Sequence, residues 1–288
     1  MLEESAEVDS AVVPSHPIAS IVIPAHNEEA SIGRCLAALT AGAREGEFEI
    51  AVVCNGCTDA SAAVARAASP SAQVIETPEA NKSLALNLGE RLVAAFPRLY
   101  VDADIELSTD AARELVACLQ QPARLAATTG LDLELSNSTP VIRRYYRAQL
   151  RASYPKHLVG QGVIALSAAG RARFHEFPSL IADDLFLQSL FTPDECVIVE
   201  SHSVTVRTPR TVKDMLYSQA RIAAGNIEYR RAYGASGYPS GVMMVIKANR
   251  SPSTWADLGI YVSLTAIARF NGQRRLRSSS GSGWRTIR

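Results

Sequence analysis

The feature that most constrains the fold is a regular alternation of two patterns over residues 18–104. Four short, apolar, β-branched runs have the composition of buried strands: 18–25, 48–54, 73–76 and 99–101. Three segments between them have the spacing of helices: 30–39, 60–68 and 81–96. Strands that alternate with helices form a parallel sheet with right-handed crossovers. We therefore predict an α/β fold with a Rossmann-like, mostly parallel central sheet flanked by helices.

Polar side chains follow three of these strands at the point where each strand ends. They are Asn27 and Glu28, Asn55 and Gly56, and Asp102 and Asp104. The carboxyl ends of parallel strands share one edge of a sheet, and ligands bind there, so we predict a nucleotide pocket at this edge. Neither the dinucleotide-binding nor the phosphate-loop glycine motif follows the first strand, which excludes those two kinds of pocket.

Asp102 and Asp104 are the candidate metal ligands. Residues two apart on a strand point to the same face, so both carboxylates can meet one cation. Hard oxygen ligands suit Mg²⁺ or Mn²⁺ carrying a diphosphate. The alternative interpretation is a solvated acidic turn, in which the aspartates cap a helix that begins near Ser108.

The pattern changes after the acidic motif. Further helices are predicted at 109–121, 141–151, 211–233 and 254–270, with strands at 124–135, 159–167 and 196–206. Asp183 and Asp184 begin one more helix. We expect five regions: a disordered acidic segment 1–17, a nucleotide-binding half 18–105, a second half 106–208, a C-terminal helical region 209–271 and a flexible basic tail 272–288.

The net charge of zero hides an uneven distribution. From Arg207 onward, 14 Lys and Arg face three acids, so this part carries +11 and the rest of the chain −11. A basic segment predicts an anionic partner, such as a diphosphate, a lipid head group or a membrane surface. Nucleic acid is excluded as a partner, because the chain has no basic motif interleaved with aromatic residues.

Cysteine usage and the absence of apolar leaders predict a cytoplasmic protein. An odd count of five Cys indicates reduced thiols, and Cys54 and Cys57 lack the second pair that a zinc site needs. No signal peptide and no run of about 20 apolar residues is found.

The last predicted helix leaves two interpretations open. Trp255, Tyr261 and flanking arginines around an apolar stretch are typical of an interfacial helix on the anionic inner face of a membrane. The same pattern suits a helix packed on the core or in a homodimer interface.

Four segments occur in a recognisable order: IVIPAHNEE with CLAAL over 21–39, FEIAVVCNGCTD over 48–59, NKSLALNLG over 81–89 and YVDAD over 100–104. Together they resemble family 2 glycosyltransferases, over roughly residues 18–226. The resemblance implies a GT-A fold, a nucleotide-sugar donor, a divalent Mn²⁺ or Mg²⁺ and inversion at the anomeric carbon.

The resemblance implies that Pro24, Ala25, Asn27 and Glu28 cradle the nucleoside, with Glu28 near the ribose or base. Asn55 occupies the turn where the family often has an aspartate pair that contacts the base, so UDP and GDP both remain open. On the residues alone, Glu28 is also explained as first-turn charge on a helix, and Asn55 as part of a turn.

The same resemblance assigns Lys82, which with Asn87 matches the nucleotide-side helix, to the diphosphate or the base. Asp102 is assigned to the ribose or the metal, and Asp104 to the metal that bridges the diphosphate. His202 is a further candidate metal ligand, as a histidine is in some relatives. The alternatives are a surface cation for Lys82 and a structural role for His202.

Asp183 and Asp184 resemble the family's Glu-Asp motif, whose second acid is the general base. Asp184 is then the base and Asp183 orients the site, whereas the alternative is a pair of helix-start acids stabilised by the helix dipole. Residues 160–163 resemble the family's glycine-containing strand beside the donor sugar and the acceptor. Arg221 partly matches an element that contacts the diphosphate or the acceptor, and the alternative is a basic surface helix.

The leading hypothesis is an inverting, metal-dependent hexosyltransferase that uses a UDP- or GDP-sugar. The tryptophan of the processive polymerases is absent, so we expect transfer of a single sugar. The acceptor is left open as a sugar, a lipid-linked molecule or a small molecule. The alternatives are a sugar-1-phosphate nucleotidyltransferase, whose glycine-rich segment is absent after the first strand, and a non-catalytic nucleotide-sugar-binding relative.

Overall fold

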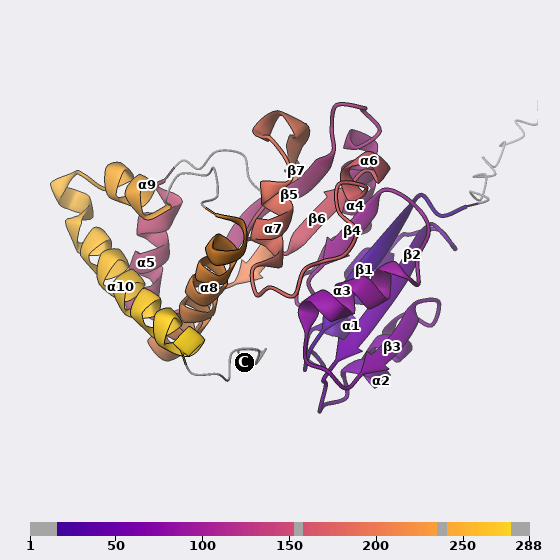
Figure 1. Cartoon of the computed structure of the whole chain (residues 1–288), viewed down its shortest axis with the longest axis horizontal. Coiled ribbons are helices and arrows are strands. Elements are labelled where there is room, and N and C mark those ends of the chain that lie inside the picture. Colours follow the sequence, from indigo (N-terminus) through magenta and orange to yellow (C-terminus); the bar gives the residue numbers. More distant parts are fainter. Residues whose placement is uncertain (1–15, 153–157, 235–240, 278–288) are drawn as a thin grey trace, which may run out of the picture.

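The structure is a computed structural model that describes residues 16–152, 158–234 and 241–277. A seven-stranded sheet forms its centre, in the order β3-β2-β1-β4-β6-β5-β7 (Figure 1). The strands are β1 (Ala19–Ala25), β2 (Phe48–Asn55), β3 (Gln73–Thr77), β4 (Arg98–Val101), β5 (Ala126–Glu134), β6 (Val163–Leu166) and β7 (Cys196–Arg207). The first four run parallel, β6 runs antiparallel to β4 and β5, and β5 pairs in parallel with β7. The predicted α/β fold with a mostly parallel central sheet is confirmed.

Helices cover both faces of the sheet. One face carries α1 (Ile32–Thr40), α2 (Ser61–Ala68) and α4 (Thr109–Cys118), and the other carries α3 (Lys82–Glu90) and α7 (Asp183–Ser189). This arrangement explains why every residue of β1 is buried: Ile21 and Ile23 pack into the first layer, and Val22 into the second.

A bundle of helices lies beside the β7 end of the sheet (Figure 1). It consists of α5 (Pro140–Leu150), α8 (Val212–Tyr233), α9 (Gly241–Ala248) and α10 (Trp255–Arg277). These helices share an apolar cluster of their own, which includes Tyr145, Met215 and Tyr261. The predicted C-terminal helical region is therefore confirmed, and α5 joins it from the middle of the chain. None of the helices in the described part of the chain is long and apolar enough to cross a membrane.

Two elements are shorter than their patterns predict. The helix expected to reach Phe96 ends at Glu90, because the Glu49 carboxylate accepts hydrogen bonds from the backbone N–H of Ala94 (2.6 Å) and Ala95 (3.1 Å) and holds them in a turn. The strand expected at 159–167 is confined to β6, because Gly160 (φ 99°) and Gly162 (φ 68°) have left-handed backbone conformations.

Other elements were missed or extend further than expected. The short helices α6 (Ala168–Arg171) and α9 were not predicted. Helix α10 reaches Arg277, which lies within the segment predicted to be a flexible tail. The rest of that tail, and residues 1–15 of the predicted acidic segment, lie outside the described residues.

Candidate functional site

Asp102 follows β4 directly and lies at the edge where the parallel strands end. Its backbone N–H donates to the carbonyl of Gly162, at 2.8 Å, so the loop before β6 lies against the aspartate. A Cβ atom on Gly162 would lie 2.7 Å from Cγ1 of Ile105 and 3.3 Å from Oδ2 of Asp102. Only glycine allows this close approach, so the loop that precedes β6 contacts the acidic motif.

Asp104, two residues after Asp102, is exposed to solvent. A turn closed by the Ile105 N–H and the Asp102 carbonyl, at 3.0 Å, exposes the side chain. The surrounding protein and the nearby Asp102 carboxylate raise the pKa of Asp104, while Lys82 and Arg221 oppose that rise. A site with this excess of negative charge is one that a cation would stabilise.

The alternative role as helix caps is not what the two aspartates do. Helix α4 is capped by Ser108, whose hydroxyl accepts a hydrogen bond from the Ala111 N–H at 3.2 Å. The carboxylates of Asp102 and Asp104 are thus not needed to begin the helix.

Lys82 joins the acidic motif to the second pair of aspartates. Asn81 caps α3 by accepting from the Leu84 N–H at 3.1 Å, which makes Lys82 the first residue of the helix. The Lys82 ammonium lies 2.7 Å from Oδ1 of Asp102 and 3.0 Å from Oδ2 of Asp183. Desolvation favours neutral lysine, but the two carboxylates outweigh it and hold the pKa of Lys82 well above its usual range.

Two helices fix the loop that leads into α7. From α3, the Asn87 side chain donates to the Phe177 carbonyl (3.0 Å) and accepts from the Phe177 N–H (2.8 Å). From α8, the Glu228 carboxylate accepts from the Ile181 N–H at 3.1 Å. A Cβ atom on Gly225 would lie 3.1 Å from Cβ of Ile181, so α8 packs closely on this loop. The second aspartate pair is therefore positioned by both halves of the protein.

Asp184 is half-buried at the start of α7. Its Oδ1 accepts a hydrogen bond from the Leu185 N–H at 2.8 Å. Burial and the adjacent Asp183 carboxylate raise the pKa of Asp184 to about 6, although Lys82 and the Leu185 N–H oppose the shift. A carboxylate of this kind is ionised at neutral pH and is a stronger base than an ordinary aspartate.

The turns after β1 and β2 bind each other through their polar side chains. Asn27 has a left-handed backbone (φ 56°), and its Oδ1 accepts from the Thr58 N–H at 2.8 Å. Asn55 is fully buried, and its Nδ2 donates to the Ala25 carbonyl at 2.8 Å. The Oδ1 atom of Asn55 is buried and has no hydrogen-bond partner among the described residues. The side chains of Asn27 and Asn55 therefore connect the two turns at the predicted nucleoside edge.

Two other predicted donor-binding positions belong to the same turn. Pro24 lies in the buried strand β1, next to Ala25. Glu28 follows, and its N–H donates to the Ser61 hydroxyl at 2.7 Å, while its carboxylate accepts from the hydroxyl of Ser31. The Glu28 side chain is partly exposed.

His202 is not brought to the aspartates. It lies on β7, which is separated from β4 by β6 and β5, or about 14 Å at the usual strand spacing. Its Nε2 lies 3.2 Å from Oε2 of Glu114 on α4. Within the described residues, no three His, Cys, Asp or Glu side chains are grouped to hold a metal ion. The chain thus offers two carboxylates, Asp102 and Asp104, which fit an ion that takes its remaining oxygen ligands from phosphates and water.

Arg221 and Glu228 connect the helical region to the site. Arg221 is close enough for its charge to lower the pKa of Asp104. Glu228 was missed by sequence reasoning, although it lies seven residues after Arg221 and hence on the same face of a helix. That spacing is the signal that could have identified it.

The fold is an α/β sheet with acidic side chains at the carboxyl edge of its parallel strands, and the sequence comparison assigns its family. The sequence model of glycosyl transferase family 2 matches residues 20–172, which is more than half of the 288 residues, so the chain belongs to that family. The resemblance inferred from the four sequence motifs is confirmed. The comparison with curated protein sequences gives no match.

Solved structures of glycosyltransferases have the same fold. The mannosyltransferase PcManGT from Pyrobaculum calidifontis, in complex with GDP-Man and Mn²⁺, has a TM-score of 0.59 at 17% identity, over 93% of this chain and 80% of that one. TarS from S. aureus, in complex with UDP, has a TM-score of 0.52 at 13% identity, over 89% and 91%. Glucosyl-3-phosphoglycerate synthase from Mycobacterium tuberculosis, with Mn²⁺, UDP and glucosyl-3-phosphoglycerate, has a TM-score of 0.53 at 19% identity, over 78% and 82%. At these identities the likeness shows the GT-A fold.

Proposed function

We propose that this protein is an inverting glycosyltransferase that moves a sugar from a UDP- or GDP-sugar to an acceptor hydroxyl. The observation that carries the proposal is the position of Lys82, whose ammonium contacts Asp102 at the nucleotide edge and Asp183 beside the candidate base. Donor and base are thereby brought to one place. The GDP-Man, UDP and Mn²⁺ in the neighbouring structures support a donor of this kind.

In this proposal Asp184 is the general base. Its carboxylate accepts the proton of the acceptor hydroxyl while that oxygen forms a bond to the anomeric carbon of the donor. The bond between this carbon and the diphosphate oxygen breaks on the opposite side, and the nucleoside diphosphate leaves with its electron pair. Attack opposite the leaving group inverts the anomeric centre. The raised pKa of Asp184 supports this role, because the carboxylate is ionised at neutral pH yet basic.

Asp104 and Asp102 would hold the divalent ion, with Asp104 contributing its exposed carboxylate. The ion would supply positive charge to the diphosphate. We do not retain His202 as a ligand, because of its distance from β4 and its contact with Glu114.

Lys82 and Arg221 would stabilise the negative charges of the aspartates and of the diphosphate. The Lys82 ammonium forms ion pairs with both Asp102 and Asp183, next to the proposed base. Lys82 is a positioning residue in this arrangement. Arg221 faces Asp104 from α8 and is placed to contact the departing diphosphate.

A thermal-shift panel of UDP- and GDP-sugars with and without Mn²⁺ tests the proposal. We expect one donor class to stabilise the fold only with metal, and Asp104→Ala to abolish that metal-dependent shift. Asp110→Ala is a matched control, since this exposed aspartate lies in α4 and pairs with Arg113. No stabilisation by any donor would contradict the proposal.

Product analysis separates the two alternatives. A sugar-1-phosphate nucleotidyltransferase would release pyrophosphate from a nucleoside triphosphate, and a non-catalytic relative would bind the donor without turning it over. Membership of glycosyl transferase family 2 favours the glycosyltransferase over both.

A further inference from the structure

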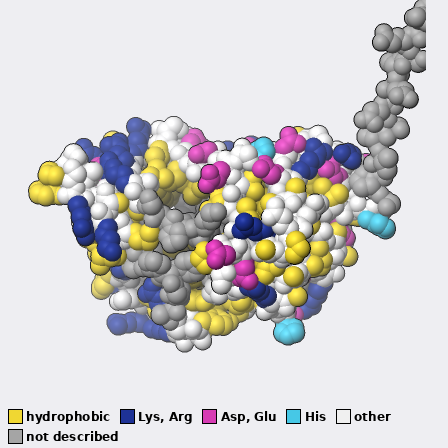
Figure 2. Space-filling model, turned by 90° about the horizontal axis from the view of Figure 1, so that it is seen from above, with side chains coloured by type: hydrophobic (Ala, Val, Ile, Leu, Met, Phe, Trp, Pro, Cys, Tyr) yellow, Lys and Arg dark blue, Asp and Glu magenta, His cyan; other side chains and the backbone are white. Residues whose placement is uncertain are grey.

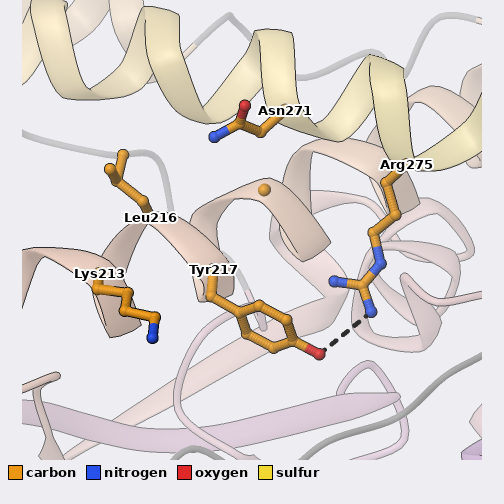
Figure 3. A pocket seen from close by; sticks show the side chains of 6 residues that line it. Lys213, Leu216, Tyr217, Asn271 and Arg275 are labelled. Carbon is orange, nitrogen blue, oxygen red and sulfur yellow. Dashed lines mark hydrogen bonds between the residues drawn. The ribbon is translucent and has the colours of Figure 1, made fainter.

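A pocket of about 560 Å³ lies between α8 and α10, outside the aspartate site (Figure 3). Its lining residues are Lys213, Leu216, Tyr217, Ala220, Asn271 and Arg275. The volume is within the usual range for a small-molecule site. No carboxylate is among these lining residues, whereas two of them carry a positive charge.

Two polar side chains of the pocket, Arg275 and Tyr217, contact each other. Arg275 Nη2 donates to the Tyr217 hydroxyl at 3.3 Å, and the guanidinium lies 4.9 Å from the centre of the Tyr217 ring. The hydroxyl accepts from Arg275, so its own proton is available to an incoming acceptor atom. Lys213 and Asn271 present further N–H donors from the two helices (Figure 3). This donor set suits an anion, and phosphate above all.

One face of α8 carries polar side chains from the pocket towards Arg221. Lys213, Tyr217 and Arg221 are spaced four residues apart, which places them one above another on the helix. Each step advances about 6 Å, and the stripe ends at Arg221, whose charge acts on Asp104. The basic stripe therefore leads from the pocket to the proposed diphosphate position.

The pocket is on the side of the site away from the nucleoside. The turns after β1 and β2 lie towards the β3 edge of the sheet, whereas α8 and α10 lie beyond its opposite end (Figure 1). Viewed from above, Lys and Arg side chains gather over the helical end of the molecule (Figure 2). A molecule in this pocket would approach the donor from the acceptor side.

We propose that the pocket between α8 and α10 binds the phosphate group of the acceptor, so that this enzyme glycosylates a phosphate-bearing alcohol. The proposal rests on the glycosyltransferase function proposed above. Arg275 and Lys213 bind the phosphate through charge-assisted hydrogen bonds, Tyr217 donates a third, and Leu216 and Ala220 provide the apolar wall. The acceptor is either a water-soluble phosphorylated alcohol or the head group of a phospholipid, which share this chemistry.

The first test measures the binding of inorganic phosphate by titration calorimetry, without metal or donor and at constant ionic strength. Without metal, the carboxylates of Asp102 and Asp104 repel phosphate, so the signal reports on the pocket. We expect Arg275→Gln and Lys213→Gln each to weaken binding at least about tenfold, the loss expected for one charge-assisted hydrogen bond. Arg274→Gln is the matched control, because Arg274 lies over the exposed Phe270 ring and does not line the pocket.

Two further arms identify the source of the phosphate. Glycerol 3-phosphate that binds wild type but not Arg275→Gln, with glycerol as the neutral control, identifies a soluble acceptor. Retention on phosphatidylglycerol vesicles that is lost in Arg275→Gln and kept in Arg66→Gln, which removes an exposed cation on α2, identifies a lipid head group. Phosphate binding that is equal in all variants, or that Arg274→Gln weakens as much as Arg275→Gln does, would overturn the proposal. The donor is absent from these measurements, so their result is independent of whether the donor panel succeeds.

Discussion

At the scale of single residues, the central relation is between Lys82 and two carboxylates from distant parts of the chain. Its ammonium is shared by Asp102 and Asp183, and it also lowers the pKa of Asp184. Removing this charge therefore affects the metal side and the base side together. A network of this kind is tested best by pH profiles, since these report the ionisation of the base directly.

Asp184 gives the first prediction. An acid whose pKa is raised to about 6 is protonated below that pH and cannot accept the acceptor's proton. We expect kcat/KM to fall as the pH drops through about 6, and to be level at neutral pH. We expect Asp184→Asn to lose at least about a hundredfold in transfer rate with donor binding unchanged. Intact turnover in this variant would refute the base assignment.

Lys82 gives the second prediction. In Lys82→Met the positive charge that opposes the rise in the pKa of Asp184 is gone, so the acidic limb of the kcat/KM profile should move to higher pH. Lys82→Arg keeps the charge and should keep the limb near its original position. The position of the limb can be measured even where the rate is low. A limb that does not move in Lys82→Met would show that Lys82 acts only on the donor.

At the scale of elements, α3 and α8 hold the loop that leads into α7 from two sides. Asn87 on α3 clamps Phe177, and Gly225 on α8 allows the helix to pack against Ile181. The helix α10 is in turn held close to α8 through Gly272, where an added Cβ would lie 2.8 Å from the Ala220 carbonyl oxygen and 2.9 Å from Cβ of Ala223. The proposed phosphate pocket depends on this contact.

Two glycines of α10 give the third prediction, because they are in the same helix with opposite surroundings. Gly272→Ala inserts a methyl group into the α8 contact and should lower the free energy of unfolding by about 1–3 kcal/mol, as overpacking does. Gly259→Ala meets nothing within 4 Å and should raise it by up to about 1 kcal/mol through helix propensity. Denaturant unfolding measures both. Equal effects of the two changes would show that α10 is not packed on α8.

The sequence was most informative where the elements are regular and the site residues follow strands. The alternation over 18–104 predicted β1 to β4 with their order of helices, and Asp102, Asp104 and Lys82 do meet at one edge. The sequence did not predict that Asn55 is fully buried, because an amide side chain at a turn can form hydrogen bonds either with water or with the protein backbone. The contact between Lys82 and Asp183 was also out of reach, since the two residues are 101 positions apart and only the packed fold brings them together.

The helical end of the molecule was predicted least well. In the sheet, β6 and β5 lie between β4 and β7, so His202 on β7 is far from the proposed metal site. A periodic sequence pattern predicts strands but not their order in the sheet. The pocket at Tyr217 and Arg275 depends on how α10 crosses α8, which composition alone does not specify. The two interpretations of the last helix are resolved in part, because one face of α10 packs on α8 and α5 through residues such as Tyr261 and Gly272.

At the scale of the whole molecule, the other face of α10 is apolar and exposed. Trp255, Val262, Ile267 and Phe270 follow helical spacing there, and Trp255 and Phe270 are 62% and 60% exposed. Basic side chains occur along the same helix and over this end of the molecule (Figure 2). Aromatic side chains among arginines suit the interface of an anionic membrane.

This face gives the fourth prediction. Wild type should co-sediment with phosphatidylglycerol vesicles and not with phosphatidylcholine vesicles, and added salt should weaken the binding. The double change Trp255→Ser and Phe270→Ser should reduce vesicle binding while leaving donor binding unchanged. A protein that is dimeric in solution, and whose dimer dissociates in the double variant without any loss of vesicle binding, would contradict the membrane interpretation and support a homodimer interface.

The most direct test of the central claim follows the stereochemistry of the transferred sugar. Proton NMR resolves the anomeric configuration of the first product formed from the donor that the thermal-shift panel selects, with water as acceptor if no better one is found. With Asp184 as base and direct displacement at the anomeric carbon, an α-linked donor should give the β-anomer first, and Asp184→Asn should give almost none. Retention of the α configuration in the first product would contradict the account.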